Sequence, residues 1–410
     1  MDDEAHHRAG TGSMGTHAKL DLALGERLQR LINPEQGIMS AAITLSAPVH
    51  DYQFSAVAGQ ARSDTEASMT LATGFHIASI AKTMTATLIL QAVEEGLCGP
   101  SGLDAKLADL DIFEPEIITR LHVKDGKSYG AELTLRHLLT HTSGMKDAMI
   151  DDGEGVASNG DLCRHSILGR MFHEMGDYGS KHWVPWDPHS PNDLNAGTLN
   201  YYLNAGGMNE TALFEPGSAF HYSDTGYVVL ALTAEKLLGA PYHVLMAERL
   251  FAPLAITDTY LAYCDDPALG PNRNPESDVY VMTLPFLASG LSLSFDWGGG
   301  GLVSTASDLN RFLIGLVSGA LFKSDDTLAL MMDWQTPEGL NAPRKAVGCG
   351  LFKLDGGGFD LVGHSGAWGS KMFYEPTSKI FVSGTLNQSN APNDWQCEFV
   401  RDALSFFNEG

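Results

Sequence analysis

The chain has 410 residues, 44% of them hydrophobic, so it is long enough for a large buried core and for two or three structural units. Its formal net charge of −24 argues against a surface that binds nucleic acid or anionic membranes, because both of these partners are negatively charged. We therefore expect no nucleic acid and no membrane among its partners.

The five cysteines lie far apart and form no C-x-x-C pair, a pattern typical of a reducing compartment and not of a disulfide framework. Residues 1–19 lack the basic and apolar segments of a signal peptide, and we expect a flexible leader there. The apolar stretches are too short to span a bilayer. These features together predict a cytoplasmic protein.

The first predicted element is a helix over residues 21–32, where apolar residues recur at helical spacing. Small and β-branched residues in 37–48 and 52–61 then predict the two strands of a hairpin. A buried helix follows and runs to about Gly96.

Residues 97–294 are expected to form a helical domain, with helices within 133–145, 226–239 and 242–254. Within this domain, residues 146–200 are rich in Asp, Gly and Asn and indicate a long irregular loop. Because the loop carries bulky aromatic residues, we expect its Trp183 and Trp186 to line a substrate pocket.

After residue 295, the sequence predicts a glycine-rich turn, several short strands and a C-terminal helix over 395–407. Strands at both ends around a helical middle indicate an α+β fold. Residues 20–96 and 295–410 would then form an α/β domain with an antiparallel sheet flanked by helices. Residues 97–294 would be an inserted all-α domain.

The head of the helix that follows the hairpin carries Ser79 and Lys82 in the string "SIAK". Residues three apart share one face of a helix, so the hydroxyl and the amine point the same way beside an apolar stripe. A lysine at the edge of an apolar core is costly unless it has a partner or a role. A capping serine and a snorkelling lysine are the ordinary explanation of such a pair, so the rest of the chain must decide.

Three further sequence strings follow "SIAK" along the chain. They are "YSD" (222–224), the glycine run 298–301 and "HSG" (364–366). Each string is weak by itself, since tyrosines before helices and His-Ser-Gly turns are common. His137 and His141, in "LRHLLTHTSGM", are interpreted as helix-packing and capping residues and not as ligands.

Together and in this order, the strings resemble the serine β-lactamase/penicillin-binding-protein superfamily, which includes class C β-lactamases, family VIII carboxylesterases and D-aminopeptidases. That family carries S-x-x-K, then Y-x-N, then K-T-G or H-x-G. The framing strings "FEPG", "YSDTGY" and "GGLVSTASDL" are similar to the family's as well. The resemblance covers about residues 21–405 and implies the fold strongly, whereas one such scaffold hosts many chemistries.

The resemblance implies that Ser79 is a nucleophile and that Lys82 lies within reach of its hydroxyl. A lysine base at neutral pH needs a pKa far below its usual value of about 10.4. Tyr222 is the second candidate base, and it is also the candidate acid that protonates the leaving group. Whether Lys82 or Tyr222 is the base stays open. The backbone N–H groups of Ser79 and Ala367 would hold the oxyanion.

The chain departs from the family pattern at two substrate-binding positions. Asp224 stands where the family has asparagine, and His364, followed by Gly366, stands where β-lactamases have lysine. Ser223, Asp224 and Thr225 also read as a degenerate S-D-N motif, although the framing strings favour the tyrosine reading. A neutral histidine is a weaker anchor for a substrate carboxylate than a lysine, which predicts a preference for neutral esters or amides over β-lactams.

These residues predict a serine hydrolase that forms an acyl-enzyme on a small carboxylic ester or amide, with carboxylesterase activity ranked first. The alternatives are an acyltransferase of the same fold, a D-aminopeptidase or weak β-lactamase, and a penicillin-binding sensor that does not turn over. No metal or cofactor is expected, since no clustered ligand set is present. The sequence leaves the oligomeric state open.

Overall fold

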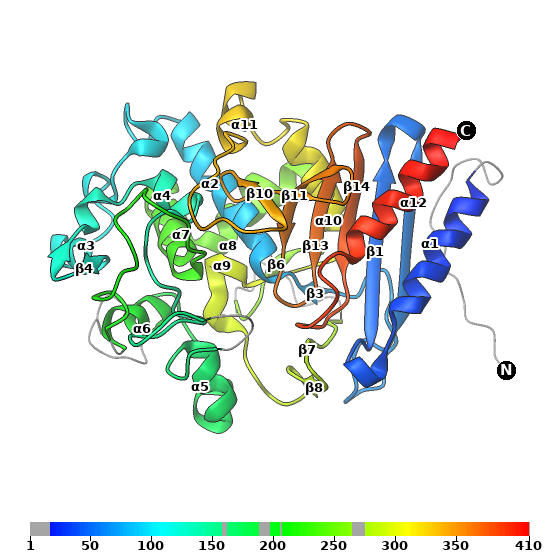
Figure 1. Cartoon of the computed structure of the whole chain (residues 1–410), viewed down its shortest axis with the longest axis horizontal. Helices are drawn as coiled ribbons and strands as arrows, with labels where there is room; N and C mark the ends of the chain where they lie inside the picture. The colour runs from blue at the N-terminus through cyan, green and yellow to red at the C-terminus, as the bar shows by residue number, and fades with distance from the viewer. Residues whose placement is uncertain (1–16, 158–161, 188–196, 206, 265–274, 410) are drawn as a thin grey trace.

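The computed structural model describes residues 17–157, 162–187, 197–205, 207–264 and 275–409 (Figure 1). Residues 1–16 of the expected leader lie outside this part of the chain. The first helix, α1 (Ala18–Leu31), begins a few residues before its predicted start.

The main sheet is antiparallel and, among the described residues, has seven strands in the order β10-β11-β12-β13-β14-β1-β2. The strands are β1 (Ser40–Ala47), β2 (Tyr52–Gly59), β10 (Arg344–Val347), β11 (Phe352–Asp355), β12 (Asp360–Ser365), β13 (Lys371–Glu375) and β14 (Ile380–Thr385). The two ends of the chain meet inside this sheet, where β1 pairs with β14 and places Thr44 opposite Ser383. The predicted α+β fold and the β1–β2 hairpin are confirmed.

The remaining helices and short strands, in chain order, are β3 (Phe75–His76), α2 (Ala81–Glu94), α3 (Pro115–Arg120), β4 (Val123–Lys124), β5 (Lys127–Ser128), α4 (Leu135–Leu139), α5 (Ile167–His173), α6 (Thr198–Asn204), α7 (Asp224–Leu238), α8 (Tyr242–Leu245), β6 (Tyr260–Leu261), β7 (Tyr280–Val281), β8 (Leu284–Pro285), α9 (Trp297–Gly300), β9 (Leu302–Ser304), α10 (Ala306–Val317), α11 (Asp325–Met331) and α12 (Trp395–Glu409). Helices α3 to α7 lie at one end of the molecule, and α1 and α12 lie side by side at the other (Figure 1).

Helices cover both faces of the main sheet because side chains alternate along its strands. Ile43 of β1 belongs to the buried cluster beneath α1 and α12, whereas Ser46 faces α10 and donates a hydrogen bond to Asn310 Oδ1 at 2.7 Å. The guanidinium of Arg27 joins α1 to α12 through two hydrogen bonds to Asp402, at 2.6 and 2.9 Å.

A second, three-stranded sheet, β3-β9-β6, leads the chain into α2. Every residue of α2 from Ala81 to Ala92 is buried, as its apolar sequence predicts. Thr85 of α2 donates a hydrogen bond to the carbonyl of Gly298 at 2.7 Å, which fixes α9 beside α2. The first turn of α2 therefore lies among α7, α9 and the main sheet.

The glycine run was expected to be a turn, but Trp297–Gly300 forms the short helix α9, so this prediction is wrong. Glycine is a poor helix former, and packing overrides its propensity here. A Cβ on Gly298 would stand 2.3 Å from the Cβ of Ala231. Because Gly298 has no Cβ, α9 can approach α7 more closely than it could with any other residue at that position.

The predicted irregular loop over residues 146–200 is wrong in part, because the segment contains α5, the beginning of α6 and a π-helical turn at Met175–Gly179. Residues 158–161 and 188–196 of this segment lie outside the described residues. Ser166 is the N-cap of α5, because its side chain accepts a hydrogen bond from the backbone N–H of Gly169. The prediction of a loop rested on the Asp, Gly and Asn content of the segment and overlooked this capping serine.

The largest buried cluster includes Leu88 of α2, Leu199 of α6 and Val362 of β12, so it continues from the helical region into the sheet. The expected division into an α/β domain and an inserted helical domain stays a prediction. Within the described residues, no single helix is long and apolar enough to cross a membrane. One pair of helical segments, Asp224–Leu238 and Tyr242–Leu254, reaches that length and apolar composition together, but the pair is sharply bent.

Candidate active site

Ser79 lies in the 3-10 turn Ala78–Ile80 that opens α2, and it is partly accessible between buried neighbours. The residue before it, Ala78, has a φ of 45°, a left-handed conformation that is strained for any residue but glycine and that is common at functional sites. Gly366 packs against this turn, since a Cβ there would come 2.2 Å from the carbonyl oxygen of Ile77. The end of β12 can therefore approach the backbone next to Ser79.

The side chain of Lys82 is completely buried and lies one helical turn beyond Ser79. Its Nζ donates hydrogen bonds to Ser79 Oγ at 3.0 Å and to the carbonyl of Gly299 at 2.7 Å, and it forms an ion pair with Asp224. Burial lowers the pKa of Lys82, but the negative charges around it, with Asp224 first, outweigh burial and raise the pKa well above its usual value. Lys82 therefore rests as an ammonium group.

Tyr222 lies between Lys82 and His141. The Lys82 Nζ is 4.9 Å from the centroid of the phenol ring, and the imidazole of His141 stacks on the same ring at 4.2 Å. Burial raises the pKa of Tyr222, and the opposing effects of Lys82 and Ser79 do not offset it. The hydroxyl has no hydrogen-bond partner of ordinary geometry among the described residues. It is thus a phenol at rest, with its hydrogen-bonding capacity available to a substrate.

Asp224 is the first residue of α7, and Ser223 before it is the N-cap. Ser223 Oγ accepts a hydrogen bond from the backbone N–H of Gly226 at 3.2 Å and donates one to the carbonyl of Lys146 at 3.3 Å. The hydroxyl of Ser223 is therefore engaged in structure, whereas the ring of Tyr222 faces Lys82. This geometry favours the Tyr-x-Asp interpretation over the S-D-N one.

His364 of β12 is buried, and its ring centroid is 6.3 Å from that of Tyr222. Its Nδ1 donates to the carbonyl of Ser365 at 2.8 Å, and its Nε2 has no partner among the described residues. Burial, aided by the nearby Lys82, lowers the pKa of His364 to about 3. The side chain is therefore neutral near pH 7 and cannot act as a cationic anchor.

Ala367 is exposed at the turn after β12, and no described residue accepts a hydrogen bond from its backbone N–H. The N–H of Ser79 belongs to the first turn of a helix, where such groups lack helical partners. These two N–H groups therefore match the donors expected for an oxyanion hole.

The two histidines interpreted as structural residues do have structural roles. His137 completes a capping box with Thr134 at the start of α4. His141 accepts a hydrogen bond from the backbone N–H of Ser223 through its Nδ1 at 3.1 Å, and it stacks on Tyr222. The stacking shows that His141 also orients a site residue, which its sequence context did not indicate.

Sequence reasoning missed Arg344, at the start of β10. Its guanidinium carbon lies 4.8 Å from the ring centroid of Phe352 and 5.9 Å from that of Tyr222. Burial lowers its pKa, and it forms no ion pair with a described carboxylate. Its neighbour in the sequence, Lys345, pairs with Asp360 at 2.6 Å in the usual manner of a strand-edge lysine. The sequence alone does not distinguish Arg344, which lies at the site, from Lys345, which forms a surface ion pair, because both are basic residues at the start of the same strand.

Sequence reasoning also missed two acidic residues behind Lys82. Asp296 precedes α9, and Asp147 lies in the segment after α4 and is fully buried. Both carboxyl groups interact with Asp224. The sequences around them, "FDWGGGG" and "GMKDAM", contain no motif that predicts their proximity to Asp224.

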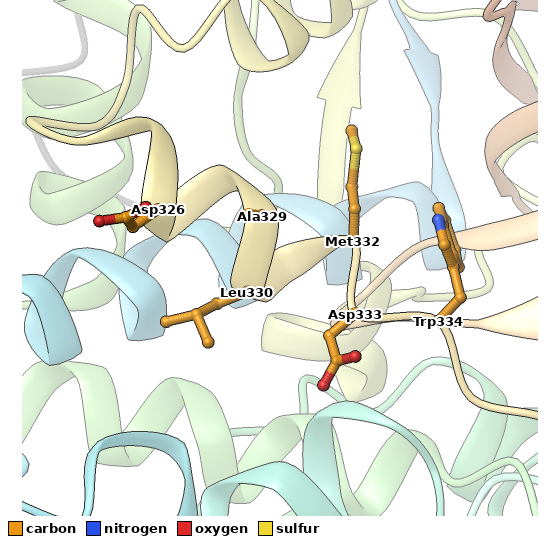
Figure 2. Close-up of a pocket in the computed structure, with 6 residues that line it drawn as sticks. All are labelled: Asp326, Ala329, Leu330, Met332, Asp333 and Trp334. Atoms are coloured by element: carbon orange, nitrogen blue, oxygen red, sulfur yellow. The ribbon is translucent and has the colours of Figure 1, made fainter.

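A cavity of about 560 Å³ lies elsewhere, at α11 and the turn that follows it (Figure 2). It is lined by Asp326, Ala329, Leu330, Met332, Asp333 and Trp334. None of these residues belongs to the group around Ser79, and Asp333 pairs with Arg136 on the surface at 3.5 Å. This cavity is therefore not part of the candidate active site.

The sequence profile of the Beta-lactamase family matches residues 35–404, which include every candidate site residue. The chain belongs to the Beta-lactamase family. Curated relatives include penicillin-binding protein 4* of Bacillus subtilis (strain 168), 27% identical over 58% of this chain and 44% of the relative, and the putative penicillin-binding protein PbpX of the same organism, 24% identical over 61% and 48%. The chain spans about half the length of these relatives.

Solved structures with the same fold include a D-amino acid amidase from Ochrobactrum anthropi SV3, 21% identical with a TM-score of 0.68 over 96% of this chain and 99% of that one. An octameric penicillin-binding protein homologue from Pyrococcus abyssi is 22% identical with a TM-score of 0.67 over 95% and 77%. These likenesses place the Beta-lactamase fold of the chain among enzymes and binding proteins of several kinds.

Proposed function

We propose that the protein is a serine hydrolase that forms an acyl-enzyme through Ser79. The observation that carries the proposal is the 3.0 Å hydrogen bond from Lys82 Nζ to Ser79 Oγ, made beside an ion pair with Asp224 and beside the phenol of Tyr222. A serine becomes a good nucleophile only when a neighbouring group takes its proton. Membership of the Beta-lactamase family supports the same chemistry.

In the proposed reaction, Ser79 Oγ attacks the carbonyl carbon of the substrate. The N–H groups of Ser79 and Ala367 hold the oxyanion, and a single donor of this kind contributes about 10²–10³ in rate. Tyr222 holds a proton at rest, so it suits the protonation of the leaving group. Water then hydrolyses the acyl-enzyme.

The proposed substrates are small carboxylic esters or amides. A D-amino acid amidase and a D-stereospecific amidohydrolase from Streptomyces sp. are among the structures with this fold, which supports amides as candidates beside esters. The neutral imidazole of His364 supports the expectation that a substrate carboxylate finds no anchor at that position.

Arg344 changes that expectation, because it brings a half-buried cation, which forms no ion pair with a described carboxylate, close to Tyr222. A partly desolvated guanidinium gains from an ionic partner, and a carboxylate is its best geometric match. We therefore propose that the preferred substrates carry a carboxylate, which would lie near Arg344 and not at His364.

An acyltransferase and a non-turnover penicillin-binding sensor remain the alternatives. Burst kinetics on p-nitrophenyl esters, D-amino acid amides and a chromogenic cephalosporin separate them. Continuous turnover in water supports a hydrolase, turnover that needs an added alcohol or amine indicates a transferase, and a burst without a steady state indicates a sensor.

A cytoplasmic location also stays part of the proposal. It is supported by the five cysteines, none of which forms a disulfide bond. Fractionation of the native host would test it, and recovery of the protein outside the cytoplasm would contradict it.

A further inference from the structure

Three aspartates from distant parts of the chain gather behind Lys82. Asp224 begins α7, Asp296 ends the 3-10 turn before α9, and Asp147 follows α4. If all three were ionised, Asp147 and Asp296 would each place a negative charge beside that of Asp224, and the ammonium group of Lys82 pairs with Asp224 alone. Like charges this close are strongly unfavourable away from water. Protons must therefore neutralise part of the group.

The oxygens of these side chains show where a proton is needed. Asp296 Oδ1 and Asp147 Oδ2 are buried and accept no hydrogen bond from any described residue, although buried acceptors nearly always have a donor. A Cβ on Gly299 would stand 2.6 Å from Asp296 Oδ1 and 3.2 Å from Asp224 Oδ1. The two carboxyl groups thus flank one point, and a proton on either one supplies the missing donor.

Asp296 and Asp147 differ in how far their pKa values are raised. Burial first, and then the charge of Asp224, raises the pKa of Asp296 to about 7, against an opposing effect of Lys82. Burial first, and then the charges of Asp224 and Asp151, raise the pKa of Asp147 well above its usual value and favour its protonated form. Asp296 is therefore the member of the group whose charge changes in the neutral range.

The other titratable groups that face Asp296 keep their charge states in this range. Lys82 of α2 is an ammonium group, because its pKa is raised well above the usual value. Tyr242 of α8 stays a phenol, because burial raises its pKa. A change of charge at the site near pH 7 thus comes from Asp296.

We propose that Asp224 and Asp296 form a proton-accepting pair for Lys82 during the acylation of Ser79. The O–H bond of Ser79 breaks and its proton moves to Lys82 Nζ, while Lys82 passes one of its own protons to Asp224 Oδ1. Ser79 Oγ then forms its bond to the substrate carbonyl carbon. Charge balances, because the negative charge leaves Asp224 and appears on the oxyanion, and Lys82 remains an ammonium group throughout.

Asp296 acts through Asp224 and is a positioning residue. An ionised Asp296 repels the charge of its neighbour and so increases the tendency of Asp224 to take a proton. A protonated Asp296 instead donates a hydrogen bond to Asp224 and holds that carboxyl in its ionised form. This inference rests on the proposed function, since it requires that Ser79 is acylated, and it predicts that acylation speeds up as Asp296 loses its proton.

The test measures the second-order rate of labelling of Ser79 by a fluorophosphonate probe between about pH 5.5 and pH 9. With one controlling ionisation, the wild-type rate should rise roughly tenfold per pH unit below about 7 and then level off. Asp296→Asn keeps the shape of a protonated acid and cannot ionise, so this rise should vanish and the rate should stay low. Asp308→Asn is the matched control, because Asp308 is another buried aspartate of raised pKa, lies in α10, and should leave the rise in place.

Infrared difference spectra of the wild-type protein give a second measurement that does not depend on the folding of a variant. The carbonyl band of a protonated carboxylic acid should disappear as the pH passes through about 7. If no such band titrates near pH 7, or if the labelling rise persists in folded Asp296→Asn, the inference is overturned and the proposed function stands. If the wild-type protein is not labelled at Ser79 at any pH, the proposed function itself fails.

Discussion

Asp224 forms a buried ion pair with Lys82 at the position where the superfamily motif has an asparagine. The pair keeps Lys82 charged, and burial keeps the proton of Tyr222 in place, so neither candidate base is free at rest. Lys82 lowers the pKa of Tyr222, but burial exceeds that effect and raises it. We therefore propose that the proton of Ser79 leaves through the Lys82–Asp224 pair.

Tyr222→Phe should cost activity without costing stability. Among the described residues the hydroxyl has no hydrogen bond of ordinary geometry to lose, so the free energy of unfolding should change by less than about 1 kcal/mol, while kcat falls about 10²–10⁴-fold through loss of a proton donor. Lys82→Ala is the contrasting variant, because it leaves Asp224 buried without its cation and should lower stability by about 3–5 kcal/mol as well as abolish activity. Urea unfolding and steady-state kinetics check both variants. A large loss of stability in Tyr222→Phe would show that the hydroxyl is a structural group.

Arg344→Met should weaken activity selectively towards substrates that carry a carboxylate. Loss of a charge-assisted contact typically costs about 1.5–3 kcal/mol, so kcat/KM should fall roughly 10- to 100-fold for a carboxylate-bearing amide and change little for its methyl ester. Lys345→Met is the matched control, since that lysine already pairs with Asp360. Equal losses on the charged and neutral members of a substrate pair would contradict a binding role for Arg344.

The double variant Asp224→Asn, His364→Lys should raise cephalosporin turnover relative to ester turnover. Asparagine both donates and accepts hydrogen bonds, whereas an ionised aspartate only accepts, and a lysine at position 364 would add a cation for the β-lactam carboxylate. The comparison is kcat/KM for nitrocefin against p-nitrophenyl butyrate in the wild type and the variant. A variant whose ratio of the two kcat/KM values equals that of the wild type would refute this account of the two positions.

Trp183→Ala should lower stability and leave substrate preference unchanged. Sequence reasoning expected Trp183 to line a pocket, but its ring packs at 5.6 Å against Tyr201 and only 3% of the residue is exposed. Removal of a buried tryptophan costs about 3–5 kcal/mol. Trp186 is half-buried against Phe113 at 5.2 Å, so its substitution should cost less. A changed preference for acyl-chain length in folded Trp183→Ala would restore the original expectation.

The sequence predicted those parts of the molecule whose signals are local or ordered along the chain. The spacing of Ser79 and Lys82, and the order of the strings that hold Tyr222 and His364, indicated a site that the structure assembles. Asp296 and Arg344 carried no such signal, because their approach to the site depends on how α9 and β10 pack. The glycine run was misread for the same reason, since only the contact between Gly298 and Ala231 explains a helix there.

Identification of the residue that reacts with a phosphonate probe tests the central claim most directly. Intact-protein mass spectrometry of the wild type should show a single adduct, and peptide mapping should place it on Ser79, with no adduct in Ser79→Ala. An adduct on any other residue, or full hydrolytic activity in Ser79→Ala, would contradict an acyl-enzyme at Ser79.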